Sequence, residues 1–89
     1  MSRTLSIIVT GRVQHVGFRY FAMKEASALN LTGYVRNMEN GDVKIIVSGP
    51  GELLDDFLIS IRKGPGWARV DDLKIQELPD EEFEGFQIK

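Results

Sequence analysis

The sequence of 89 residues predicts an α+β fold, in which a mainly antiparallel sheet carries two helices on one face. Segments with alternating apolar residues indicate strands, and two segments with apolar residues at steps of three and four indicate helices. An Asn-Gly pair between two strand-like runs indicates a hairpin. The resulting order is β-α-β-β-α-β with a short C-terminal strand, which is typical of a ferredoxin-like sandwich.

A strand, a helix and a hairpin are predicted in the first half of the chain. Residues 4–10, TLSIIVT, are rich in β-branched residues and place alternate apolar side chains on one face. From about Phe18 to Leu29 the apolar residues recur at helical spacing. Residues 32–38 and 42–48 have the pattern of two more strands, and Asn40-Gly41 between them favours a tight turn. These two strands are therefore expected to be antiparallel neighbours.

A second helix and two strands are predicted in the second half. Pro50 is expected within the first helical turn, where its missing N–H costs nothing, and Gly64-Pro65-Gly66 ends the helix. Val70 to Leu78 is predicted as a fourth strand, and Phe83 to Ile88 as a short final strand. No repeat or linker divides the chain, so residues 1–89 are expected to form a single domain.

Composition argues against several classes of function. The net charge of −2 and the pI near 5.3 disfavour a general binder of nucleic acids or acidic membranes. With no cysteine and one histidine, the chain lacks the side chains for a disulfide, a thiolate metal site or a zinc cluster, and we expect no metal. No targeting peptide or membrane span is recognisable, which favours the cytoplasm.

The stretch GRVQHVGFR, residues 11–19, is the candidate binding loop. It joins the first strand to the first helix, whose N-terminal N–H groups lack internal partners and carry partial positive charge. Arg19 enters the helix beside this loop, and its guanidinium suits phosphate oxygens. The patterns GxxxxGK[ST] and GxGxxG are absent, so the expected ligand is a small anion and not a nucleotide. The alternative is an ordinary glycine-containing turn with a solvated arginine.

Two longer motifs resemble the acylphosphatase family. VTGRVQHVGFR (9–19) is similar to the family's first signature, with His15 where the family has glycine. GYVRNMENGDVKIIVSG (33–49) resembles the second signature throughout. GPGWARV (64–70) and FEGFQIK (83–89) are similar to later segments of the family, so the resemblance covers essentially the whole chain.

The resemblance implies hydrolysis of acyl phosphates to a carboxylate and inorganic phosphate, without metal or cofactor, by a cytoplasmic monomer. Arg19 is then the phosphate-binding arginine, and Asn37 positions the attacking water. In some relatives the terminal carboxylate pairs with the active-site arginine, which suggests a contact between Lys89 and Arg19. The phosphate, or a sulfate in its place, is held by the backbone amides of His15, Val16, Gly17, Phe18 and Arg19.

His15 leaves three alternatives open. If φ is positive at this position, or if a side chain there blocks the phosphate, His15 strains or narrows the loop. If the backbone is ordinary and the side chain points outward, which we expect, the loop is unchanged. In the third case a protonated imidazole adds a donor to the bound phosphate.

Two other functions fit the same element order. A catalytically weak anion-binding or regulatory module is the alternative that His15 raises. An RNA-recognition domain shares the β-α-β-β-α-β order, but it needs exposed aromatic residues on its central strands, and DVKIIVS (42–48) has none. We therefore expect a small acyl phosphate as the partner, and neither nucleic acid nor membrane.

Overall fold

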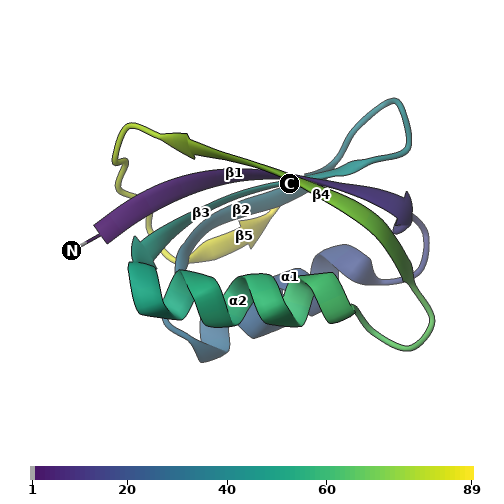
Figure 1. Cartoon of the computed structure of the whole chain (residues 1–89), viewed down its shortest axis with the longest axis horizontal. Helices are drawn as coiled ribbons and strands as arrows, with labels where there is room; N and C mark the ends of the chain where they lie inside the picture. The colour runs from purple at the N-terminus through teal and green to yellow at the C-terminus, as the bar shows by residue number, and fades with distance from the viewer. Residues whose placement is uncertain (1) are drawn as a thin grey trace.

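A five-stranded sheet with both helices on one face makes up the computed structural model, which describes residues 2–89 (Figure 1). The strand order is β4-β1-β3-β2-β5, and all neighbouring strands are antiparallel except β2 and β5, which run parallel. The predicted ferredoxin-like fold is therefore confirmed. None of the helices within residues 2–89 is long and apolar enough to span a membrane. The elements are β1 (Ser2–Arg12), α1 (Phe18–Ala28), β2 (Thr32–Asn37), β3 (Val43–Pro50), α2 (Gly51–Lys63), β4 (Arg69–Leu78) and β5 (Phe86–Ile88).

The core lies between the sheet and the two helices. Alternate residues of β1 and β3 form its floor, and the register pairs Ile7 with Ile45 and Val9 with Val43. All four side chains are completely buried. The period-two pattern of these strands therefore places one apolar face against the helices, as the sequence predicts. The helices contribute buried side chains at helical spacing, namely Phe18, Ala22, Ala26, Leu54, Phe57 and Ile61.

Two element boundaries differ from the prediction. Pro50 has extended backbone (φ −60°, ψ 141°) and is the N-cap of α2, so it ends β3 and is not part of the helix. The final strand begins at Phe86 and not at Phe83, because Gly85 has a φ of 64° that interrupts extended backbone. Phe83 packs edge-on against Tyr34 instead, with ring centroids 6.1 Å apart.

A β-bulge near the end of β1 directs the chain toward α1. The pairing of β1 with β4 shifts between Thr10 and Gly11. Gly11 has a φ of 131°, and a Cβ at this position would overlap the carbonyl oxygen of Arg69. The position therefore requires glycine for both conformation and space. Because a bulge bends its strand, it changes the direction in which β1 delivers the following loop.

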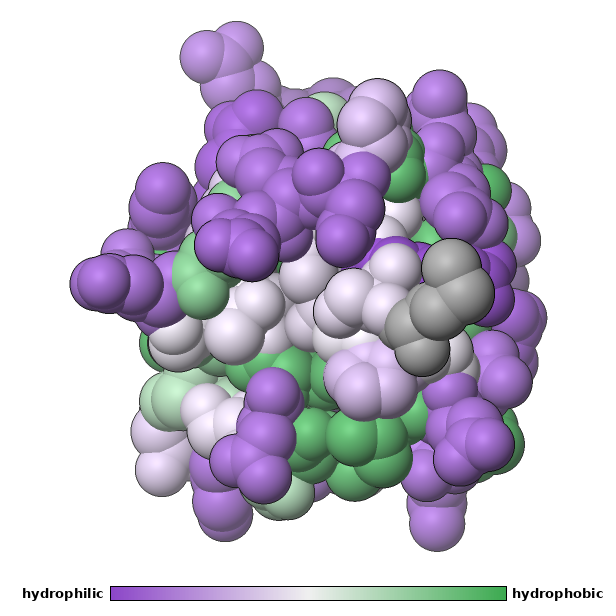
Figure 2. Space-filling model, turned by 90° about the vertical axis from the view of Figure 1, so that its left-hand side faces the viewer, coloured by the Kyte–Doolittle hydropathy of each residue, from purple (hydrophilic) through white to green (hydrophobic). Residues whose placement is uncertain are grey.

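Two buried hydroxyl groups hold the connection between β4 and β5. These strands lie at opposite edges of the sheet, so residues 79–85 cross its end, on the left in Figure 1. Thr4 Oγ1 and Ser48 Oγ lie 2.6 Å apart on adjacent strands. The Glu81 amide donates to Thr4 Oγ1 at 3.0 Å, and Ser48 Oγ donates to the Glu81 carbonyl at 3.0 Å. Figure 2 views this end, where hydrophilic side chains cover most of the rim.

Replacing Thr4 with valine tests this anchor. Thr4→Val keeps the side-chain shape but leaves the Glu81 amide without its acceptor, so we expect a loss of about 1–3 kcal/mol in the free energy of unfolding. Urea denaturation followed by circular dichroism measures the change. Thr10→Val is the matched control on the same strand, because among residues 2–89 the Thr10 hydroxyl makes a single long bond, 3.4 Å to the Asp72 carbonyl. If both variants lose the same amount of unfolding free energy, the hydroxyl groups of Thr4 and Ser48 do not stabilise the connection between β4 and β5.

Candidate functional site

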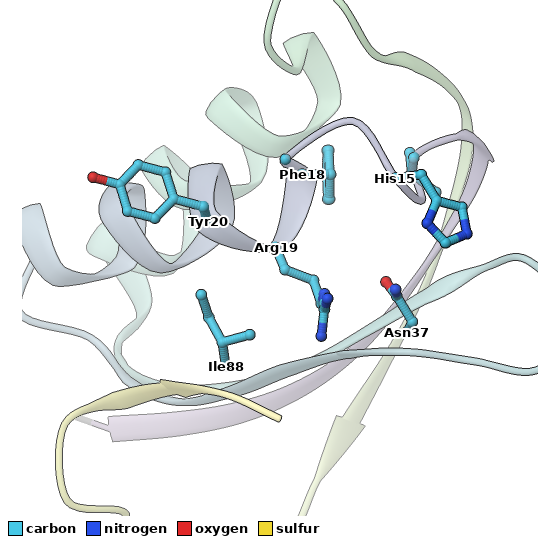
Figure 3. Close-up of a pocket in the computed structure, with 8 residues that line it drawn as sticks. His15, Phe18, Arg19, Tyr20, Asn37 and Ile88 are labelled. Atoms are coloured by element: carbon cyan, nitrogen blue, oxygen red, sulfur yellow. The ribbon is translucent and has the colours of Figure 1, made fainter.

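A cavity of about 190 Å³ lies where the β1–α1 loop meets the end of β2 and the end of β5 (Figure 3). It brings together Arg19 and Asn37, the two side chains for which the sequence predicts a catalytic role. Val16, one of the predicted loop residues, packs against the core and is not part of the lining. The residues that line the cavity are Val13, His15, Gly17, Phe18, Arg19, Tyr20, Asn37 and Ile88.

The core fixes both ends of the loop. Val13 and Phe18 are each only 1% exposed, so a buried side chain anchors each end of the loop between them. Within this loop His15 has a φ of 62° and Gly17 a φ of 76°, while Val16 between them has a negative φ. Alternation of this kind turns successive N–H groups toward one concave side, which is the geometry of an anion-binding nest.

The start of α1 adds to this positive potential. Gly17 is the N-cap, and the first helical hydrogen bond runs from the Phe21 amide to the Gly17 carbonyl at 3.0 Å. Within residues 2–89 no side chain caps the helix, and its first turn contains no acidic residue. The first amides of α1 and the positive end of the helix dipole are therefore directed to the site without a competing carboxylate.

His15 has a left-handed backbone, so the expectation of an ordinary backbone there was wrong. Histidine is among the non-glycine residues that tolerate this region. Its side chain is exposed at the cavity, and in Figure 3 the imidazole lies on the same side of Arg19 as Asn37. The imidazole therefore borders the site and is not turned away from it.

Arg19 is held at the centre of the site by the end of β5. Its half-buried side chain extends from α1 toward the sheet, and Nη1 donates to the main-chain oxygen of Lys89 at 3.1 Å. The Lys89 amide in turn donates to the Val35 carbonyl on β2 at 2.8 Å. The arginine is thus oriented by a main-chain group that is itself fixed to the sheet, leaving its other N–H groups available to a ligand.

Asn37 presents a buried amide oxygen to the cavity. It is the last residue of β2 and pairs with Val43 of β3. Its Oδ1 is buried and has no hydrogen-bond partner within residues 2–89. Since buried polar atoms are nearly always satisfied, an unpartnered acceptor at a cavity indicates a place for a water or ligand donor.

Gln14 connects the loop to the hairpin that follows Asn37. Its Nε2 donates to the Met38 carbonyl at 2.7 Å and to the Asp42 carbonyl at 2.8 Å. The Met38 amide donates to the same Asp42 carbonyl at 2.8 Å and closes the turn. Nothing in the sequence pattern indicates this connection between Gln14 and the hairpin. The spacing between the loop and Asn37 depends on it.

Tyr20 and Ile88 also line the cavity, and neither was among the predicted site residues. Tyr20 follows Arg19 directly, which is the one sequence feature that could have identified it. Ile88 comes from the far end of the chain, and only the parallel pairing of β5 with β2 places it here. The chemical content of the site is a nest of amides, one guanidinium, one amide oxygen, one imidazole and two exposed apolar side chains.

Known proteins resemble this chain in sequence and in fold. The family model described as Acylphosphatase matches residues 5–88. The chain is 42% identical to an acylphosphatase of Vibrio vulnificus over 97% of this chain and 96% of the relative. It is 49% identical to an acylphosphatase of Bacillus licheniformis over 91% of this chain and 88% of the relative. The crystal structure of acylphosphatase from Bacillus subtilis superposes with a TM-score of 0.94 at 38% identity, covering 100% of this chain and 99% of that one. With a matching family model and relatives aligned over nearly their full lengths, the chain belongs to the acylphosphatase family.

Proposed function

We propose that this protein is an enzyme that hydrolyses acyl phosphates to a carboxylate and inorganic phosphate. The observation that supports the proposal is that residues of the β1–α1 loop, Arg19 and Asn37 line one cavity, and that Asn37 Oδ1 is buried there without a partner among residues 2–89. Membership of the acylphosphatase family favours catalysis over the alternative of a weak anion-binding module.

In this mechanism the loop and Arg19 hold the phosphoryl group. The amides of residues 15–19 and the guanidinium stabilise charge that spreads over the phosphoryl oxygens in the transition state. Because these donors are fixed by the core and by β5, little reorganisation is needed when the substrate binds. The proposed mechanism uses no metal and no cofactor.

Asn37 orients the nucleophile. A water that donates one hydrogen to Oδ1 directs its lone pair toward phosphorus, and the amide acts as a positioning group because it cannot accept a proton. The water attacks phosphorus, the P–O bond to the acyl group breaks, and the proton of the water passes to the phosphate product. The leaving carboxylate has a pKa of about 4–5, so no general acid is required.

We propose that the protein acts as a single-domain monomer in the cytoplasm. All strands within residues 2–89 join one sheet, which supports a single domain. The edge strand β4 is exposed and charged, with Asp71, Asp72, Lys74 and Glu77, and such charges oppose edge-to-edge association of sheets.

Removing Arg19 or Asn37 tests the mechanism. Hydrolysis of benzoyl phosphate should fall by roughly 10²- to 10³-fold in Arg19→Ala and in Asn37→Ala, because each loses a group that stabilises or aligns the transition state. Arg62→Ala, an exposed arginine on α2, is the matched control and should retain wild-type activity. Turnover by the wild type no greater than that of Arg19→Ala would contradict the proposal and favour the anion-binding module.

A measurement of phosphate binding distinguishes the proposed role of Arg19, which binds the phosphoryl group, from that of Asn37, which positions the water. The chain's only tryptophan, Trp67, has its Nε1 3.7 Å from the position of a Cβ on Gly17, so its fluorescence should report occupation of the loop. We expect Arg19→Ala to weaken phosphate binding, and Asn37→Ala to bind phosphate nearly as the wild type does.

Exchanging His15 for the family's glycine tests the left-handed residue. His15→Gly should leave benzoyl phosphate hydrolysis within about tenfold of wild type or raise it, since the donors to phosphate are main-chain amides. His15→Ala is the companion variant, because it keeps a Cβ at positive φ and removes only the imidazole. A loss well beyond tenfold in both variants would show that the imidazole itself contributes to binding or catalysis.

Gln14 is expected to act on the rate through Asn37. Gln14→Ala removes both bonds to the hairpin, so we expect a loss of about 1–3 kcal/mol in unfolding free energy. The kcat should fall more than the affinity for phosphate, because the nucleophile's side of the site is loosened while the loop amides remain. Gln76→Ala, an exposed site on β4, is the control. An unchanged kcat in Gln14→Ala would show that the hairpin holds Asn37 without this tether.

A further inference from the structure

His15 combines a left-handed backbone with a side chain at the cavity. Within residues 2–89 only one other non-glycine residue, Asn30, has a positive φ, and it does not line this cavity. Such a conformation costs free energy and persists only where the surrounding structure maintains it, and residues of this kind cluster at functional sites. The His15 side chain is therefore a candidate for a role in the site.

The imidazole lies on the side of the cavity where the attacking water is proposed to bind. His15 and Asn37 both line the cavity, and Figure 3 draws both on the same side of Arg19. The buried Oδ1 of Asn37 is the proposed acceptor for that water. Because the His15 side chain is exposed, it can exchange a proton with the solvent. A group that can gain a charge therefore borders the side from which the water attacks.

The cavity offers a protonated imidazole no carboxylate as a partner. Among residues 2–89 the lining contains no acidic side chain, and its other ionisable groups are Arg19 and Tyr20. The Tyr20 side chain extends away from Arg19 in Figure 3. The charged side chains on the elements around the loop lie outside the lining, and they are Arg12, Arg36, Glu39, Asp42, Arg69, Asp71, Asp72 and Lys89. Of the carboxylates, Asp42 accepts a hydrogen bond from Asn40 and Asp71 accepts one from Arg69. An anion bound in the cavity is therefore the negative group that an imidazolium would meet there.

The proposed reaction places a new oxygen on the His15 side. In phosphoryl transfer the attacking and leaving oxygens lie roughly in line on opposite sides of phosphorus. The acyl group of the substrate then points away from Asn37, and the substrate has no phosphoryl oxygen in the position of the attacking water. The phosphate product carries a fourth oxygen at that position. A donor beside Asn37 thus meets an oxygen that the product has and the substrate lacks.

We infer that protonated His15 binds the phosphate product through the oxygen that the water supplies, so that product is retained more tightly as the pH falls below neutral. This inference rests on the proposed function and adds a pH-dependent control of the same site. Imidazole gains its charge between about pH 8 and pH 5, and its N–H then donates a charge-assisted hydrogen bond. In the empty site the Arg19 guanidinium disfavours a second positive charge. A bound dianion favours it, so phosphate binding and protonation of His15 are linked.

Product inhibition tests this role. The inhibition constant of inorganic phosphate and the KM for benzoyl phosphate are measured for the wild type, His15→Asn and His15→Ala at about pH 5.5 and about pH 8. Asparagine tolerates a left-handed backbone but cannot gain a proton. Dividing each variant's constant by the wild-type constant at the same pH cancels the titration of phosphate itself. The quotient of inhibition constants should be about three to ten at the lower pH and about one at the higher pH, as expected for one partly exposed charge-assisted hydrogen bond. The quotient of KM values should stay near one at both.

A second charge on α1 supplies the control. Lys24→Gln removes a positive charge from an exposed site outside the cavity lining and should leave both quotients near one. Quotients of inhibition constants that do not change with pH overturn the inference, and so does a rise in KM that matches the rise in the inhibition constant. An effect of His15→Ala that His15→Asn does not share also overturns it, because the charge of the imidazole then plays no part.

Sulfate binding distinguishes the failure of this inference from that of the proposed function. Sulfate is a dianion with four oxygens at both pH values, and Trp67 fluorescence follows its binding. Tighter binding by the wild type than by His15→Asn at the lower pH alone supports the inference. Hydrolysis of benzoyl phosphate together with equal sulfate binding by the wild type and both variants overturns the inference alone. No hydrolysis by the wild type overturns the proposed function and, with it, the product-binding role of His15.

Discussion

The burial of Val13 and Phe18 is the constraint on which the site depends. Both side chains are almost completely enclosed by the core, so the ends of the loop between them are fixed in position. That confinement maintains positive φ at His15 and Gly17, a conformation that a free loop would abandon at little cost. Phe18 also starts α1, so the direction of Arg19, the next residue, is set by the same buried ring.

The remaining parts of the site arrive from distant parts of the chain. Asn37 comes from the end of β2, and Gln14 ties the hairpin that follows it to the loop. The group that orients Arg19 belongs to Lys89, the residue after β5, and β5 reaches its place only after residues 79–85 have crossed the opposite end of the sheet. The hydroxyl groups of Thr4 and Ser48 therefore affect the site indirectly. They hold Glu81 in the connection that leads to β5 and so to Lys89.

Periodicity predicted the two helices and the long strands correctly, because burial of one face imposes a repeat that is visible in the sequence. The hairpin followed from the turn residues Asn40-Gly41. It failed where the backbone departs from a repeat. Nothing periodic marks Gly85 as the residue that delays β5, and Pro50 fits the end of a strand as well as the start of a helix.

In the candidate site, the sequence predicted the main residues but not the contacts that position them. Arg19, Asn37 and the loop followed from motifs, and the structure places them together. The sign of φ at His15, the two bonds of Gln14 and the position of Ile88 depend on contacts between segments far apart in sequence. Such contacts leave no local pattern, so only the folded chain reveals them.

The shortness of β5 has a consequence for motion. This strand pairs with β2 at three register positions, and its Phe86 packs against Phe57 at the edge of the core, so its detachment would uncover that edge but leave the pairing of β1 with β3 and β4 intact. Local opening of a short edge element costs less free energy than global unfolding. Detachment of β5 would release Arg19 from the Lys89 main chain while the loop and Asn37 stay in place. The guanidinium would then sample more orientations in an otherwise native molecule, so the ordering of this one side chain and the stability of the fold are separable quantities.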